Sequence, residues 1–229
     1  MSTIAGMAEV AALVGDPART AMLNALMQGR ALTAKELALT AGVSAPTTSG
    51  HLGRLAAAGL VAVTAQGRHR YYRLASPRVA ALLESLSVVA AFSSPARPGV
   101  RSPQEQALRL ARTCYDHLAG RLGVALADSM IARGYVVLGD DGGEVTVAGA
   151  GFLGDHLDID TAALGRRRAF CRPCLDWSER RPHLAGAIGA AIASRCFEAG
   201  WIERRRATRA LTITPAGRAA FVEMFAVSL

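Results

Sequence analysis

The residues of this chain with the clearest chemical potential are cysteines and histidines in its second half. Cys171 and Cys174 form a Cys-x-x-Cys pair, and two thiolates at this spacing, supplied by one turn, can bind one tetrahedral ion. Cys114 and His117 lie three residues apart and would share one face of a helix. Because thiolate-rich sets favour soft or borderline ions, these four residues predict a Cys3His site for Zn(II), Cd(II), Hg(II) or As(III). Further candidate ligands are Asp116, Asp176 and His183.

Three other interpretations of the same residues stay open. Cys171 and Cys174 could form a redox-active disulfide, because Arg172 between them would lower the pKa of a thiol. A small organic effector could bind between the C-terminal repeats, where the aromatic side chains are Tyr115, Tyr135, Trp177 and Trp201. Cysteine is also a common small core residue, so a purely structural role needs no ligand.

The sequence carries none of the common catalytic motifs. It has no Walker loop, no dinucleotide-binding glycine fingerprint and no nucleophile elbow. We therefore do not expect an enzyme. The competing hypothesis is a metallo- or redox enzyme that uses the same cysteines and histidines and is tethered to a DNA-binding module.

An internal repeat contains these residues. Residues 117–136 align without gaps with residues 183–202, both starting His-Leu-Ala-Gly, and at the same offset residues 145–151 align with residues 211–217. Each copy predicts a helix, a strand, a turn, a strand and a helix, which is a winged-helix-like order. Glycine and alanine recur at helical spacing in both copies and predict a close approach between helices.

The repeat also sets two expectations for the elements around it. At its offset Asp116 aligns with Pro182, so the alignment predicts no pair of equivalent carboxylates. One long helix is expected over about 103–133, and it would carry both Cys114 and His117.

The first third of the chain predicts a helix-turn-helix followed by a β-hairpin. Helices are expected over 16–29, 32–42 and 43–61, each beginning near a capping residue. Residues 60–74 then predict two short strands around a turn with basic residues at its tip. The second helix of such a motif lies in the DNA major groove, and a basic hairpin beside it can reach phosphates or the minor groove.

The predicted DNA contacts are hydroxyl, imidazole, guanidinium and phenol groups on this second helix and on the hairpin. Such groups suit phosphate oxygens and base edges. The residues are Ser44, Thr47, Thr48, Ser49, His51, Arg54, Arg68, His69, Arg70 and Tyr71.

Residues 5–92 carry a family resemblance. The pattern Ser-x-x-Thr-x-Ser-x-His-Leu over 44–52, with Arg-Tyr-Tyr in the hairpin, resembles the winged-helix domain of ArsR/SmtB-type transcriptional repressors. The resemblance implies a homodimer on a palindromic DNA operator, held by flanking helices such as 79–92, and derepression when an inducer binds. Metal-sensing relatives carry cysteines in the first helix of the helix-turn-helix, or His and Asp ligands on the dimer helix. The corresponding segments here, 33–42 and 76–92, contain neither Cys nor His, so any sensor must lie elsewhere.

The bulk composition is compatible with DNA binding. The 229 residues include 26 Lys and Arg against 18 Asp and Glu, a net charge of +8, which favours an anionic partner. The longest apolar helical stretch, 79–92, is too short to span a membrane, and the N-terminus lacks the pattern of a signal peptide. We therefore expect no membrane partner and a cytoplasmic location, where the cysteines would be thiols, ligands or redox groups.

These observations predict a mainly α-helical fold with small β-hairpins, of the α+β class. Residues 1–92 would form a winged helix-turn-helix domain for DNA binding and dimerisation, and residues 93–106 a linker rich in Pro, Ser and Gly. Residues 107–229 would form a sensing and dimerisation domain of two winged-helix-like repeats, at about 107–165 and 171–229. The functional hypothesis is a homodimeric repressor, released from its operator when an ion or an oxidant acts on the C-terminal cysteines and histidines.

Overall fold

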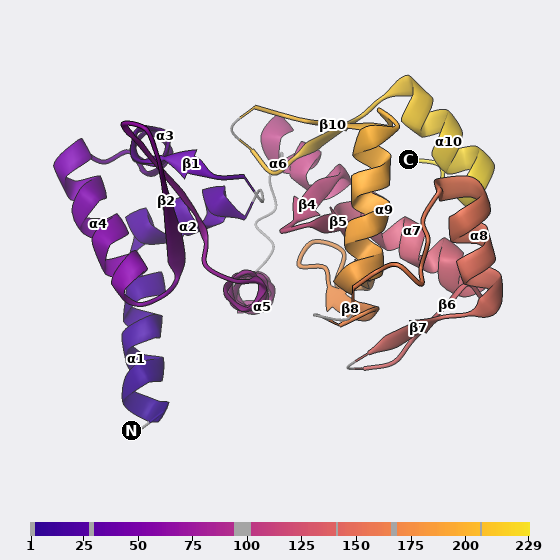
Figure 1. Ribbon diagram of the computed structural model, residues 1–229, viewed down its shortest axis with the longest axis horizontal. Coiled ribbons are helices and arrows are strands. Elements are labelled where there is room, and N and C mark those ends of the chain that lie inside the picture. Colours follow the sequence, from indigo (N-terminus) through magenta and orange to yellow (C-terminus); the bar gives the residue numbers. More distant parts are fainter. Residues whose placement is uncertain (1–2, 28–29, 94–101, 141, 166–168, 207) are drawn as a thin grey trace. The chain divides into compact units, whose positions relative to one another are not determined.

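The computed structural model describes residues 3–27, 30–93, 102–140, 142–165, 169–206 and 208–229. The chain divides into two compact units, Met1–Leu86 and Ser87–Leu229 (Figure 1). Both units combine helices with short antiparallel strands, which confirms the α+β class. The predicted linker, 93–106, lies mostly outside the described residues, and from Pro103 onward it belongs to a helix of the second unit.

The first unit is a winged helix. Its elements in chain order are α1 (Thr3–Val14), α2 (Pro17–Leu26), β1 (Leu32–Thr33), α3 (Ala34–Ala41), α4 (Ala45–Ala57), β2 (Val61–Gln66), β3 (His69–Leu74) and α5 (Pro77–Ser93), which extends past the boundary of the unit. Three of these helices begin at residues that cap them: Asp16 caps α2, Ser44 caps α4, and Thr33 with Glu36 forms the capping box of α3. Gly42 ends α3 with a φ of 66°, a conformation that glycine adopts without steric cost.

The strands of the first unit form one antiparallel sheet with the order β1-β3-β2. β2 and β3 pair from Val61↔Leu74 to Gln66↔His69, around a turn at Gly67. This hairpin is the wing. The core beneath the helices and the sheet contains Met22, Leu23, Leu26, Leu37, Leu52, Leu55 and Tyr72.

The second unit contains the same order of elements twice, after helix α6 (Pro103–Leu110). The first copy is β4 (Arg112–Cys114), β5 (His117–Ala119), α7 (Gly120–Ala132), β6 (Val136–Leu138), β7 (Gly143–Val145) and α8 (Val147–Leu157). The second copy is β8 (Arg172–Leu175), β9 (Pro182–Ala185), α9 (Gly186–Glu198), β10 (Ile202–Arg204), β11 (Leu211–Ile213) and α10 (Pro215–Phe225). Each copy contains the predicted helix, strand, turn, strand and helix, and each begins with an additional hairpin that we did not predict.

The two copies also share their local devices. Thr146 caps α8 and Thr214 caps α10, each accepting a hydrogen bond from a glycine N–H three residues later, at Gly149 and Gly217. A Cβ at either glycine would lie 2.0 Å from a backbone carbonyl oxygen, so both helices start against the backbone at a distance that only glycine allows.

The helix expected over about 103–133 is interrupted, and this prediction was wrong. α6 ends at Leu110, and the hairpin β4–β5 separates it from α7, so Cys114 and His117 are cross-strand partners rather than residues on one helix face. Gly120 begins α7 with a φ of 76°. Strands of three residues are too short to leave a period of two in the sequence, and the helical periodicity on both sides concealed the hairpin.

The helices of each copy pack on the hairpin of the other copy. α7 packs on β9. α9 packs on β5 (Figure 1). A Cβ at Gly123 would lie 3.6 Å from the Cβ of His183, and a Cβ at Gly189 would lie 3.2 Å from that of His117. The close approach that these glycines permit is thus between a helix and a strand, not between two helices as we predicted. The two copies share one apolar core.

Candidate functional site

The hairpins β4–β5 and β8–β9 each present one cysteine and one histidine. Cys114 is the cross-strand partner of His117, and Cys174 is the cross-strand partner of His183. Directly opposite residues of an antiparallel pair project from the same face of the sheet. Each hairpin therefore holds a thiol beside an imidazole.

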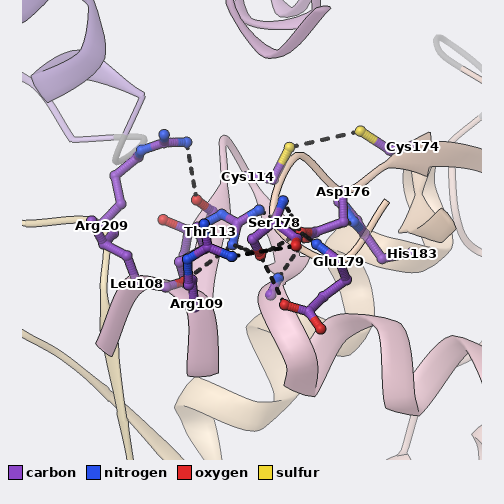
Figure 2. A network of polar contacts seen from close by, with 12 residues as sticks. Leu108, Arg109, Thr113, Cys114, Cys174, Asp176, Ser178, Glu179, His183 and Arg209 are labelled. Carbon is purple, nitrogen blue, oxygen red and sulfur yellow. Dashed lines mark hydrogen bonds and ion pairs between the residues drawn. The ribbon is translucent and has the colours of Figure 1, made fainter. Parts of the chain in front are cut away.

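These four side chains converge, and we refer to them as the Cys/His cluster (Cys114, His117, Cys174 and His183). One potential ligand atom from each lies within 4.8 Å of those of the other three. The two Sγ atoms are 3.8 Å apart and point toward each other (Figure 2), and the centroids of the two imidazole rings are 5.1 Å apart. Cys114 and both histidines are buried, and Cys174 is partly exposed. The cluster has the composition and spacing to hold one ion or to undergo thiol chemistry.

Each histidine of the Cys/His cluster has an aspartate carboxylate near its Nδ1 atom. Asp116 Oδ1 lies 3.1 Å from His117 Nδ1, and Asp176 Oδ2 lies 3.3 Å from His183 Nδ1. The Nε2 atoms of both rings are buried and have no hydrogen-bond partner among the described residues. The Nδ1 atom of His183 also lacks a partner in hydrogen-bond geometry among these residues, so Asp176 meets that ring through an ion-pair contact only.

Asp176 also forms a buried ion pair with Arg112. Arg112 Nη2 donates to Asp176 Oδ2 at 2.8 Å, and both side chains are 0% exposed. The same carboxylate accepts hydrogen bonds from the Gly120 N–H at 2.7 Å and from the Ser178 N–H and hydroxyl. Trp177, predicted as part of an aromatic wall, covers the Arg112 guanidinium at 4.5 Å. This network connects the first turn of α7 in one copy to a cluster histidine in the other.

The neighbours of the Cys/His cluster change its protonation. The thiol of Cys114, followed by the nearby imidazoles, holds the pKa of Cys174 far below its usual value, and this effect outweighs burial. Burial alone would lower the pKa of His183, but its contacts with Asp176 and Cys174 raise that pKa to about 9. Burial would raise the pKa of Asp176, but His183, Arg112 and the Gly120 N–H lower it. The thiolate is the form of cysteine that binds metals, and the lowered pKa of Cys174 favours that form.

Cys171 does not join the cluster, and the predicted Cys3His set is corrected to two cysteines and two histidines. Cys171 precedes β8, its carbonyl oxygen accepts a hydrogen bond from the Gly143 N–H, and its side chain is buried in the apolar core. Residues three apart in an extended strand face opposite sides, so Cys171 and Cys174 do not act together as they would in a helical turn. Burial raises the pKa of the Cys171 thiol to about 11, contrary to the lowering expected from Arg172. The predicted Cys171–Cys174 redox pair is corrected likewise, because the facing thiols are those of Cys114 and Cys174.

The equivalence of Asp116 and Asp176 and the role of Arg112 were not predicted, although a repeated sequence motif indicates both. Arg-x-Cys-x-Asp occurs at 112–116 and again at 172–176, so Asp116 and Asp176 are equivalent, and Arg112 has a mate in Arg172. The strand register aligns these segments, since Arg112 pairs with Ala119 and Arg172 with Ala185. The connection between the strands is longer in the second hairpin. The alignment that matches the histidines therefore sets Asp116 against Pro182.

The predicted DNA-contacting residues lie on α4 and the wing of the first unit. Most are exposed: Ser44, Thr47, Ser49, Arg54, Arg68, His69 and Arg70. His51 and Tyr71 are half-buried, and His51 Nδ1 lies 3.3 Å from the Arg19 guanidinium. The N-terminal turn of α4 and the tip of the wing thus present a polar and basic surface.

Thr48 is the exception among these residues. Its side chain is buried, and its hydroxyl donates to the Ser44 carbonyl oxygen at 2.9 Å. The prediction that Thr48 contacts DNA is corrected, because the residue faces the core and stabilises the first turn of α4.

A helix-turn-helix with an exposed polar helix and a basic β-hairpin defines the winged helix-turn-helix class of DNA-binding proteins. A model described as the MarR family matches residues 16–70, from the cap of α2 into β3. Over 214 residues the chain is 42% identical to YdfF of Bacillus subtilis (strain 168), an uncharacterized HTH-type transcriptional regulator, covering 93% of this chain and 94% of YdfF. The chain belongs to this family of HTH-type transcriptional regulators, which is not a family of enzymes.

Two solved structures with similar sequences each match less than half of this chain. The homodimeric winged helix-turn-helix domain (fragment 1–100) of Mb0332 from Mycobacterium bovis, a possible ArsR-family regulator, is 30% identical and covers 38% of this chain and 80% of its own, with a TM-score of 0.36. The cadmium metal-sensor CMTR from Mycobacterium tuberculosis is 30% identical and covers 42% of this chain and 98% of its own, with a TM-score of 0.32.

Among the helices that the structure describes, none combines the length and apolar character needed to span a membrane.

Proposed function

We propose that the chain is a homodimeric repressor of the ArsR type, which leaves its DNA operator when an effector acts on the Cys/His cluster. Residues 1–92 bind DNA and dimerise, and residues 107–229 sense the effector. The observation that carries this proposal is that the candidate DNA-contacting side chains and the thiols lie in different units. The exposed basic wing and polar helix lie in the first unit, whereas the thiols lie in the second unit.

The surface of the first unit supports DNA binding. Arg68 and Arg70 at the tip of the wing are exposed, so both guanidinium groups can reach phosphates beside the groove that holds α4. Thr47, Ser49 and Arg54 are exposed on α4 itself, where they can contact phosphates and base edges.

Two helices that flank the helix-turn-helix support dimerisation. Ile4 and Met7 on α1 are 76% and 70% exposed, and Leu86 and Val89 on α5 are 43% and 60% exposed. Large apolar side chains at helical spacing on a helix surface are typical of a protein interface. A second copy of the chain, related by a twofold axis, would cover them and match a palindromic operator.

The effector would act by shifting the dimer between two states. It can do so only if it binds one state more tightly than the other. All four cysteines lie in the second unit, and so do both histidines of the Cys/His cluster. An effector that reacts with thiolates would therefore act there, and the first unit would transmit the change to DNA.

We expect Arg68→Ala and Arg70→Ala each to weaken operator binding about tenfold and to reduce the slope of log affinity against log salt by about one, because each removes one phosphate contact. The measurement is fluorescence anisotropy at several salt concentrations, with an operator selected from a random DNA pool by the full chain. Arg121→Ala is the matched control, because Arg121 is exposed on α7 in the other unit. Unchanged affinity and slope in both wing variants would contradict the proposed DNA contact.

A further inference from the structure

The Cys/His cluster is built from equivalent parts of the two copies. Each copy contributes a cysteine and a histidine that are cross-strand partners, and each histidine has an aspartate at Nδ1. We propose that the cluster is a closed Cys2His2 site for one tetrahedral divalent ion of the zinc class, and that this ion joins the two copies. The inference rests on the proposed function only where it names the effector. The binding site itself does not depend on DNA binding.

The separation of the sulfur atoms supports a metal site. Zn–S bonds of about 2.3 Å in a tetrahedral site place two sulfur ligands about 3.8 Å apart, and the observed Sγ–Sγ distance is 3.8 Å. A disulfide requires about 2.05 Å. The thiols of Cys114 and Cys174 are therefore already at the spacing that a shared ion needs.

The imidazole nitrogens support the same assignment. The Nε2 atoms of His117 and His183 are buried without a hydrogen-bond partner in the part of the chain that the structure describes, and buried polar atoms are rarely left unpartnered. The Nδ1 atoms face Asp116 and Asp176. A metal-bound histidine typically has its second nitrogen oriented by a carboxylate in this way, which leaves Nε2 for the ion.

The ligand types select the class of ion. Two thiolates and two imidazoles in tetrahedral geometry suit zinc. Calcium and magnesium prefer oxygen ligands, and the carboxylate beside His183, that of Asp176, is already paired with Arg112. Four protein ligands leave no open coordination position, which is typical of structural and regulatory zinc sites and not of catalytic ones.

The position of the site indicates how a bound ion would affect the two copies of the second unit. It lies between hairpins β4–β5 and β8–β9, and each hairpin packs on the helix of the other copy. A bound ion therefore restrains both copies at once. Its arrival or loss would therefore change how the two copies are restrained, which is the kind of change that a sensor requires.

The test is a titration of the full, reduced and metal-free chain with Co(II), followed by displacement with Zn(II). We expect one Co(II) per chain, the strong visible absorption of tetrahedral cobalt, a near-ultraviolet band from thiolate-to-cobalt charge transfer, and loss of both bands on addition of Zn(II). Cys174→Ala removes a ligand and is expected to weaken cobalt binding at least about 100-fold. Loss of a residue that only supports a ligand typically weakens metal binding by about 10–100-fold. Cys171→Ala is the matched control and should retain both bands.

Circular dichroism of each metal-free variant checks that it folds. Cys174 is partly exposed, so its replacement should be tolerated. If Cys174→Ala nevertheless fails to fold, the wild-type spectrum still decides, because octahedral cobalt without a charge-transfer band would overturn the proposal. Equal loss of binding in Cys171→Ala and Cys174→Ala would also overturn it, as would reduced chain that binds no metal.

Parallel operator titrations with and without Zn(II) separate this inference from the proposed function. Normal operator binding by a chain that takes up no metal overturns the metal site alone. Tight metal binding with unchanged operator affinity supports the site and overturns the effector step of the proposed function. If the chain gives a normal cobalt spectrum but binds the operator neither with nor without Zn(II), the result supports the metal site and overturns the proposed repressor function.

Discussion

Replacing Asp176 by alanine is expected to destabilise the second unit by about 3–5 kcal/mol, the cost of leaving a buried charge without its counter-ion. Asp176 and Arg112 form an ion pair at 2.8 Å, and both side chains are 0% exposed. Trp177 covers the guanidinium, so Arg112 cannot reach water without a rearrangement. The chain's two tryptophans, Trp177 and Trp201, both lie in the second unit, and urea unfolding followed by tryptophan fluorescence therefore reports on that unit.

The matched control for Asp176→Ala is Asp128→Ala. Asp128 pairs with Arg181 at a similar distance, 2.7 Å, but these side chains are 38% and 60% exposed. An exposed pair contributes about 0–1 kcal/mol. Equal losses of stability in the two variants would contradict the buried network, since the prediction depends on burial and not on the presence of an ion pair.

Asp176 is also expected to position the metal ligands. Its carboxylate contacts His183 Nδ1 and accepts a hydrogen bond from the Gly120 N–H at the start of α7. Its loss should therefore weaken cobalt binding, by about 10–100-fold for a residue that supports a ligand. Asp128→Ala should leave cobalt binding unchanged.

The first unit was predicted well because its signals are local. Asp16, Thr33 and Ser44 each cap a helix within three residues of themselves, and Gly67 forms the turn of the wing. Such features depend on neighbouring residues only, so the sequence displays them directly. Thr48 was assigned to the wrong face because its hydroxyl resembles those of exposed neighbours, while its burial is set by tertiary packing.

The second unit was predicted in part. The helices and the second hairpin of each copy follow from periodicity, and cysteine and histidine are rare enough for their chemistry to attract attention. Which of them converge depends on the pairing of three- and four-residue strands, which local patterns do not encode. Cys171 was included because a Cys-x-x-Cys pair suggests one turn, and in a strand this spacing separates the two thiols. The burial of Arg112 was not predicted, because nothing in the sequence of a basic chain indicates which arginine is fully buried.

Gly189 provides the second large effect, since Gly189→Ala is expected to destabilise the second unit by about 1–3 kcal/mol, the usual cost of overpacking. A Cβ there would lie 2.3 Å from the Leu184 carbonyl oxygen and 3.2 Å from the Cβ of His117. The Leu184 contact lies within β9, beside His183. Because the substitution pushes α9 away from two strands that carry cluster ligands, cobalt binding should also weaken, by about 10-fold or more.

Helix propensity alone predicts the opposite result for Gly189→Ala, because alanine in a helix interior is more favourable than glycine by about 0.5–1 kcal/mol. Gly154→Ala isolates that effect: Gly154 lies in α8, and a Cβ there would meet nothing within 4 Å. We expect Gly154→Ala to stabilise the second unit in the tryptophan-monitored urea titration and to leave the cobalt spectrum intact. Stabilisation by both variants would mean that α9 does not press against the hairpins, and the two copies would then lack the packing through which a bound ion could act on the whole unit.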